Sequence, residues 1–340
     1  MRYAVGPIAQ SVEQRTFNPW VDGSSPSGPT SQKSFPHRYY SQMTPTPYSN
    51  VVVWGLSNVR HSHRYIHRGF YESLHQSGIN VNWVSDSKRS QSAIRKGSVV
   101  IAVGFASEFL PIRKDAAYVL HNFDSDITSS LRTFINLQVT SKDSRGINID
   151  DSIAQWDSDS RTLFQPWGLP EHQSQWLEPC KAAGKTEYWV GAVWDNSLKQ
   201  GNLSTIRAYQ DALDRVEIKF KKVGGTRGIS KGGLTSERAF NLVNTSPIGA
   251  AIVGSWQCLN RYIPCRAFKN IAAGAIPISN ANFSHVFGDS YIHEESIPKL
   301  IDTAINLKIE TRKELNAACK EKLISYSYQR AFNRMLEVLH

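Results

Sequence analysis

The sequence of 340 residues lacks the features that would assign it to several special classes of protein. Its four cysteines include no Cys-x-x-Cys pair, which argues against a zinc site or a disulfide scaffold and favours a reducing, cytoplasmic compartment. No run of about 18 apolar residues occurs, so we expect no transmembrane helix. The net charge of +10 is spread along the chain without a long basic block. That charge suits anionic small ligands or peripheral contact with an acidic membrane, and we expect no nucleic acid partner.

Residues 1–42 also lack hydrophobic periodicity and are rich in Ser, Pro, Gly and Gln. Such a segment buries too little apolar surface to offset the entropy lost on ordering, so we expect it to be disordered. The stretches 6–19 and 22–30, the second containing Gly23-Ser-Ser-Pro26, resemble the peptide that results when a tRNA gene is translated. This resemblance implies a non-native extension without function and a native start at Met43. The alternative is a simple flexible tail.

The most informative stretch that is present covers residues 261–280. Pro264 suits the first turn of a helix, Arg266 follows within that turn, and a glycine ends the helix before a short apolar strand. A cation at a helix start can hold a phosphate group. The alternative is that Arg266 and Lys269, one turn apart on an otherwise apolar helix, are a pair of surface side chains whose charged ends reach solvent.

Apolar runs separated by helical patterns and glycine turns predict a mixed α/β fold. In the first half we expect a helix over 64–76 and strands over 51–54, 79–84, 98–103, 117–120, 134–139 and 161–164. Strands that alternate with helices imply a parallel sheet with helices on both faces. The first half is therefore expected to be Rossmann-like.

A second series of elements begins after a polar stretch that contains proline and glycine. We expect strands over 188–193, 216–220 and 249–253, and helices from Asn202 to about 213 and over 235–243, 296–307 and 310–339. The predicted architecture is two Rossmann-like domains in tandem. Their expected bounds are 43–170, a linker over 171–186, 187–310, and a helix over 311–340 that packs back on the first domain.

Two clusters of polar residues in the first half are candidate sites. His121 and Asp124 follow a predicted strand, at the carboxyl edge where open α/β sheets bind ligands, and either can act as a general base. The alternative is a loop cap. A basic cluster lies around the start of the first predicted helix and contains Arg60, His61, His63, Arg64, His67 and Arg68. Its arginines would repel a cation, so we favour a solvated face or an anion contact and expect no metal.

Two glycine motifs have different implications. Gly55 follows the first strand, but its surroundings lack the spaced glycines of a dinucleotide loop, so a nicotinamide cofactor is not indicated. Residues 224–233 form a glycine-rich loop with Arg227 that could wrap phosphates. That loop lacks the ending of a Walker motif, and a merely flexible loop is an equal alternative.

From about Val51 onward the chain resembles the GT-B glycosyltransferases, including family 1-like and CgeB-like members. The closest correspondence is Arg266-Ala-Phe-Lys-Asn-Ile-Ala-Ala-Gly-Ala-Ile-Pro-Ile-Ser279, which is similar to the family's R-x-F-E-A-x-A-x-G-x-P-x-I-S helix. Ser325-Tyr-Ser-Tyr-Gln-Arg330 resembles a final H-x-T-Y-x-x-R segment. Gln165-Pro-Trp-Gly168 and Trp189-Val-Gly-Ala-Val-Trp194 resemble segments that close the first domain and open the second.

This resemblance implies an α/β fold of GT-B type and a metal-independent transferase without a cofactor. It implies a nucleotide-sugar donor on the second domain, a glycan, lipid-linked or small acceptor on the first, and transfer in the cleft between them. The donor-binding residues implied are Gly191, Arg227, Arg266, Lys269 and Asn270. Lys269 stands where the family has a glutamate for the donor ribose, and Asn270 is the substitute.

The acceptor side would use Gly55, Arg60, His61 and Arg64. In an inverting reaction, His121 or Asp124 would deprotonate the acceptor hydroxyl. The departing diphosphate would need only stabilisation of its developing charge. The alternatives are a nucleotide-sugar epimerase of the same fold and a non-catalytic protein that binds sugar or nucleic acid.

Overall fold

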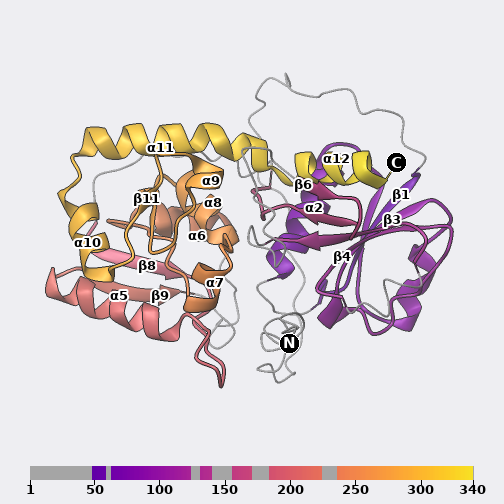
Figure 1. The fold of residues 1–340 in the computed structure, drawn as a ribbon, viewed down its shortest axis with the longest axis horizontal. Coiled ribbons are helices and arrows are strands. Elements are labelled where there is room, and N and C mark those ends of the chain that lie inside the picture. The colour runs from indigo at the N-terminus through magenta and orange to yellow at the C-terminus, as the bar shows by residue number, and fades with distance from the viewer. Residues whose placement is uncertain are drawn as a thin grey trace.

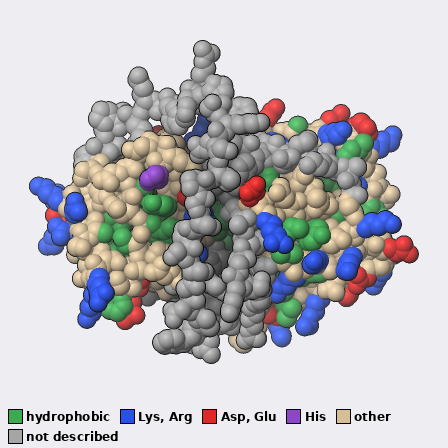
Figure 2. All heavy atoms as spheres, turned by 180° about the vertical axis from the view of Figure 1, so that it is seen from behind, with side chains coloured by type: hydrophobic (Ala, Val, Ile, Leu, Met, Phe, Trp, Pro, Cys, Tyr) green, Lys and Arg blue, Asp and Glu red, His purple; other side chains and the backbone are tan. Residues whose placement is uncertain are grey.

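The computed structural model describes residues 48–58, 63–123, 131–139, 155–170, 184–223 and 236–339. Within these ranges the chain forms two regions, each with strands and hydrophobic clusters of its own (Figure 1). The expected extension over 1–42 and most of the expected linker lie outside the described residues. Seen from behind, Lys and Arg side chains are distributed over both regions rather than gathered in one block (Figure 2).

The first region is built on a seven-stranded sheet in the order β2-β1-β3-β4-β5-β7-β6. Its strands are β1 (Asn50–Trp54), β2 (Val81–Val84), β3 (Ser98–Val103), β4 (Ala117–His121), β5 (Phe134–Gln138), β6 (Gln155–Asp157) and β7 (Thr162–Phe164). Neighbouring strands run parallel except β6 and β7, which are antiparallel. The valine-rich strands β1 and β3 are buried along their whole length, as parallel strands covered on both faces are. The predicted α/β class with a largely parallel sheet is confirmed.

The two faces of this sheet are covered differently. One face carries α2 (Arg64–Gln76) and α12 (Tyr328–Leu339), whose Phe70 and Phe332 join one apolar cluster with Val53 of β1. In the part of the chain that the structure describes, the other face carries only the short 3-10 helices η1 (Lys88–Ala93) and η2 (Gly104–Ala106) together with loops. The predicted helices on both faces are thus seen on one face only among the described residues, and residues 124–130 and 140–154 between the strands lie outside them.

The serines before and within η1 give the physical reason why this helix is short. The hydroxyls of Ser85, Ser87 and Ser90 contact one another at 2.9 to 3.4 Å. Serine side chains that form such local bonds compete with helix formation, so the crossover from β2 to β3 stays short.

The second region has two small parallel sheets, β8 (Thr186–Val190) with β9 (Lys219–Val223) and β10 (Ile278–Ser279) with β11 (Ile292–His293). Its helices are α5 (Leu203–Arg215), α6 (Ser236–Asn244), α7 (Ser255–Leu259), α8 (Cys265–Ala272), α9 (Ser284–Phe287), α10 (Ile297–Asn306) and α11 (Ile309–Leu323). Apolar residues of α5 and α10 pack in one cluster, and those of α8, α9 and α11 pack in another. The second region therefore has two apolar clusters of its own, formed by different helices.

Residues 248–254 are buried but form no strand, so the strand predicted over 249–253 is wrong. Their backbone groups bond largely to side chains instead of to a ladder. Glu187 of β8 accepts from the amides of Ile248 and Gly249 at 2.9 to 3.2 Å. Asn280 accepts from the amide of Val253 at 2.9 Å and donates to its carbonyl at 3.0 Å. Side chains distant in sequence thus replace the strand partners that a sequence pattern would assume.

The closing helix predicted over 310–339 is broken into two. α11 is followed by the 3-10 helix η3 (Ile324–Tyr326), and α12 starts at Tyr328. Between them Ser327 is extended and forms a parallel bridge with Leu169. A Cβ on Gly168 would overlap the Tyr326 carbonyl oxygen, so the two segments can lie this close only with glycine there. At this crossing α11, over the second region, gives way to α12, over the first (Figure 1).

Candidate functional site

Arg266 lies in the first turn of α8, as the sequence predicts, because Pro264 ends the preceding loop in an extended conformation and caps the helix. The Cζ atom of Arg266 lies 3.7 Å from the ring centroid of Trp189, on the neighbouring strand β8. Nε contacts the Val190 carbonyl at 3.4 Å, and Nη1 contacts the Ile252 carbonyl at 3.3 Å. An aromatic face and two carbonyls thus fix the direction of the guanidinium.

The guanidinium carries a charge that no carboxylate in the described part of the chain balances by an ion pair. Burial lowers the pKa of Arg266 to about 10, which still leaves it protonated at neutral pH. A Cβ on residue 191 would overlap Nη2, so glycine leaves this atom room. The structure therefore brings together Gly191 and Arg266, as the resemblance implies, around a partly buried cation suited to an anion.

The next two predicted residues of α8 point in different directions. The Nζ atom of Lys269 lies 4.3 Å from the ring centroid of Tyr65, which belongs to α2 of the first region. Burial lowers the pKa of Lys269, and the nearby Arg266 adds to the effect. Asn270 is buried and donates to the Gly249 carbonyl at 2.7 Å. Lys269 thus joins the two regions, whereas the amide of Asn270 supports the irregular segment.

His121 ends β4 at the carboxyl edge of the large sheet, where the sequence places it. Its Nδ1 lies 2.9 Å from the Leu137 carbonyl, which can only accept, so Nδ1 carries the proton. Burial lowers the pKa of His121 to about 4, so the ring is neutral at neutral pH. Its Nε2 can accept a hydrogen bond from a hydroxyl, but such a low basicity makes it a weak proton acceptor.

An aromatic cluster surrounds His121. The ring of His63 stacks on it with centroids 5.3 Å apart and an interplanar angle of 11°. Trp167 meets both rings edge to face, at 5.0 Å from His121 and 5.2 Å from His63, and His67 lies 5.3 Å from His63. His63 directly precedes α2 and is half-exposed, so it is the imidazole of the stack that solvent reaches.

The remaining predicted residues are placed as follows. Gly55 has a φ of 84°, and its carbonyl accepts from Trp83 at 2.8 Å. Arg64 lies over the Trp83 ring with its Cζ atom 5.5 Å from the centroid. Asp124, Arg227, Arg60 and His61 lie outside the described residues.

The starts of α2 and α8 meet at the boundary of the two regions. Lys269 contacts Tyr65, and Tyr262 and Cys265 pack against the apolar cluster of the first region. The described residues include no group of His, Cys, Asp or Glu that could hold a metal ion. None of the helices in the described ranges is long and apolar enough to span a membrane.

Two functional candidates were missed by reasoning from the sequence. Trp189 lies under the guanidinium of Arg266, yet the sequence marks it only as the start of the segment that resembles the opening of the second domain, not as a contact of Arg266. His63 was seen as one of several basic residues, and nothing in the sequence shows that it stacks on His121, about 58 positions later. Both contacts join segments that only the fold brings together.

No known protein family and no curated protein matches this sequence. Solved structures do match. The N-terminal domain of Candida albicans trehalose-6-phosphate phosphatase is similar with a TM-score of 0.51 at 10% identity, over 89% of this chain and 99% of that chain. The α,α-trehalose 6-phosphate synthase of Burkholderia multivorans has a TM-score of 0.49 at 8% identity, over 85% of this chain and 98% of that one.

At such low identity these likenesses concern the fold alone. The match to the phosphatase domain extends over most of the chain, so this protein shares the course of a mixed α/β fold with that domain. The chemistry of the site has to be argued from its own residues.

Proposed function

We propose that this protein is a metal-independent glycosyltransferase with two Rossmann-like domains of GT-B type. It would move a sugar from a nucleotide-sugar donor to a glycan, lipid-linked or small acceptor. The motif around Arg266 supports this proposal, and so does the presence of separate strands and cores in the two regions. The basic composition is consistent with a cytoplasmic enzyme that contacts the membrane surface peripherally.

The observation that carries the proposal is the guanidinium of Arg266, which pairs with no carboxylate among the described residues. It lies at a helix start, against Trp189 and beside the glycine at residue 191. A departing nucleoside diphosphate develops negative charge that must be met as the glycosidic bond breaks. A fixed cation at a helix start provides such stabilisation without a metal.

The other residues would divide between the two substrates. The second region would bind the donor through Gly191, Arg227, Arg266 and Lys269, while the amide of Asn270 holds the backbone beside them. The first region would present the acceptor along Gly55, Arg60, His61 and Arg64. In an inverting reaction Asp124 would take the acceptor proton, and His121 would accept a hydrogen bond through Nε2.

A donor screen tests the proposal. Protein starting at Met43 is incubated with a panel of nucleotide sugars, with and without candidate acceptors, and the released nucleoside diphosphate is measured. Release that depends on an acceptor supports transfer, whereas conversion of the donor without any acceptor would indicate an epimerase. A folded protein that neither binds nor turns over any donor would contradict the proposal.

A matched pair of variants assigns the site. Arg266→Ala should weaken donor binding by about tenfold or more, since a charge-assisted contact contributes about 1.5 to 3 kcal/mol. Arg207→Ala removes an equal charge from the exposed side of α5 and should leave the affinity unchanged. Equal affinity in both variants would remove Arg266 from the site.

A further inference from the structure

A cavity of about 490 Å³ opens on the first region, on the sheet face that η1 covers. It lies mainly at the beginning of β1 and β2, the opposite end of the sheet from His121, and its lining extends along β2 to Val84. β1 spans five residues, so at about 3.3 Å per step its first and last Cα atoms are roughly 13 Å apart. The polar side chains that line it include Asn50, Asn80, Asn82, Arg89, Ser92 and Arg95.

The cavity exists because η1 is too short to fill this face. Further along β1 the same face carries Val52 and Trp54, which are buried in an apolar cluster. At the cavity it carries Asn50, which is only 7% exposed, and Asn82, whose amide donates to the oxygen of Asn50 at 3.0 Å. Polar side chains occupy positions where the sheet pattern calls for apolar ones.

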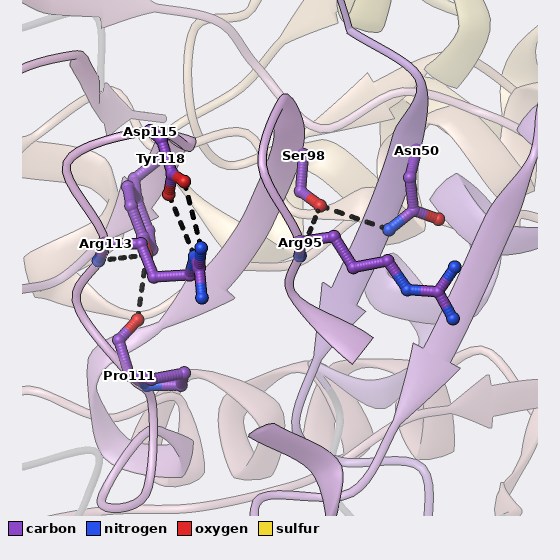
Figure 3. Close-up of polar contacts among 7 residues, drawn as sticks. All are labelled: Asn50, Arg95, Ser98, Pro111, Arg113, Asp115 and Tyr118. Atoms are coloured by element: carbon purple, nitrogen blue, oxygen red, sulfur yellow. Dashed lines mark hydrogen bonds and ion pairs between the residues drawn. The ribbon is translucent and has the colours of Figure 1, made fainter. Parts of the chain in front are cut away.

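The carboxamide of Asn50 ties the wall of the cavity together (Figure 3). Its Nδ2 donates to the Ala93 carbonyl at 3.1 Å and to Ser98 Oγ at 3.2 Å, and the same Oγ accepts from the Arg95 amide at 2.9 Å. These bonds fix the backbone from which the Arg95 side chain extends. The cavity wall is therefore an ordered polar surface.

The charge of the cavity is unbalanced. Within the described part of the chain, the guanidiniums of Arg89 and Arg95 make no ion pair, and no acidic side chain lines the cavity. Two carboxylates nearby in the sequence are already engaged. Asp86 accepts from the Trp54 indole and the Glu108 and Phe109 amides at 2.8 to 3.0 Å.

Asp115 is engaged in the same way, since it holds Arg113 in a two-pronged pair with both distances 2.9 Å (Figure 3). It therefore leaves the charges of Arg89 and Arg95 unmatched. A guanidinium presents its N–H groups in a planar fork that matches phosphate oxygens, and carboxamides and serine hydroxyls supply the bonds that sugar hydroxyls need.

We propose that this cavity is a binding site for the phosphate group of a small hydroxylated phosphomonoester. The volume falls within the usual range of small-molecule sites, about 300 to 1,000 Å³. Arg89 and Arg95 take the phosphate, and Asn82 with Ser92 faces the hydroxylated part. The site lies at the other end of the sheet from the proposed transfer site and does not depend on that function.

Calorimetric titration of the full chain tests the site with three probes: sodium phosphate, glucose 6-phosphate and glucose. Glucose 6-phosphate should bind more tightly than phosphate, and glucose should not bind. The double variant Arg89→Ala/Arg95→Ala should lose at least tenfold in affinity for glucose 6-phosphate. Both side chains are exposed, so this variant should fold normally.

Two controls separate this site from others. Arg207→Ala/Arg215→Ala removes the same charge from α5 and should bind like the wild type, as should Arg266→Ala. An equal loss in the α5 variant, or binding that disappears with Arg266→Ala, would overturn the proposal, as would no binding of either phosphate compound. Binding to vesicles that contain phosphatidic acid shows whether the phosphate belongs to a lipid. If the protein binds these vesicles more tightly than glucose 6-phosphate, and this binding needs Arg89 and Arg95, the phosphate is that of a lipid headgroup.

Discussion

The two regions satisfy their buried backbones by different means. In the first region the backbones of the central strands of a seven-stranded sheet bond to one another, and apolar side chains pack on the two faces. In the second region the buried segment 248–254 relies on side chains, among them Glu187 and Asn280. A ladder shares its bonds among many residues, whereas a side chain can be removed by one substitution. The second region should therefore be far more sensitive to single polar substitutions.

The largest effect is expected for Glu187→Ala. It removes the acceptor for the amides of Ile248 and Gly249 and for the Tyr209 hydroxyl, all buried. At about 1 to 3 kcal/mol for each unsatisfied group, we expect a loss of about 4 kcal/mol in the free energy of unfolding, measured by chemical denaturation.

Asn136→Ala is the matched change in the first region. Among the described residues, the side chain of Asn136 bonds to the side chains of Thr162 and Gln138, so its loss should cost about 1 kcal/mol or less. If Glu187→Ala and Asn136→Ala lose similar amounts of unfolding free energy, the two regions do not differ in their sensitivity to polar substitutions.

Gly168→Ala should have the second-largest effect on stability, because its methyl group would overlap the Tyr326 carbonyl at the crossing between the regions. Neither backbone segment can move without breaking the contact between Leu169 and Ser327, so we expect a loss of about 3 kcal/mol. Gly78→Ala is the control: its φ of 76° is strained for alanine, but nothing lies within 4 Å of the added methyl, and about 1 kcal/mol is expected. Equal melting temperatures for Gly168→Ala and Gly78→Ala would show that the crossing can accommodate a methyl group at residue 168.

Asn280→Ala should cost about 2 kcal/mol, since both backbone groups of Val253 lose their partner. Asn280→Asp keeps the acceptor for the amide but not the donor for the carbonyl, so it should fall between Asn280→Ala and the wild type. Denaturation curves of the three proteins check the order. A fully stable Asn280→Ala would mean that water replaces the side chain.

Stability should also depend on pH, with opposite signs for two buried groups, Glu187 and His121. Burial raises the pKa of Glu187 to about 7 from an ordinary value near 4.5, so between these values the folded state keeps a proton that the unfolded chain has lost. Stability from this group is therefore present at low pH and falls, by about 1 kcal/mol per pH unit, as the pH rises through that window.

His121 acts in the opposite direction. Its pKa falls to about 4, so between about 4 and 6.5 the unfolded chain binds a proton that the folded state does not, and stability rises with pH. His285, with a pKa also lowered to about 4, adds to this rise. Unfolding of the wild type and Glu187→Gln, compared from pH 4.5 to 7, isolates the falling component. A difference that stays constant over this range would show that Glu187 is ionised throughout.

Much of the fold could be predicted from local sequence. Valine-rich runs identify β1 and β3, and the spacing of Pro264 and Arg266 identifies the start of α8. The failures have one physical origin. The apolar run over 249–253 has the composition of a strand, but most of its partners are the side chains of distant residues, which no local pattern encodes. Likewise, the break at Ser327 depends on its contact with Leu169.

The sequence by itself determined the α/β class and placed a cation at a helix start, because periodicity, proline and glycine act over a few residues. Tertiary structure decided what surrounds that cation. It put the indole of Trp189 under the guanidinium and stacked His63 on His121. Elsewhere it left Arg89 and Arg95 around a polar cavity, without acidic partners among the residues that the structure describes. Contacts between segments far apart in the chain depend on how whole elements pack, and local patterns do not record that packing.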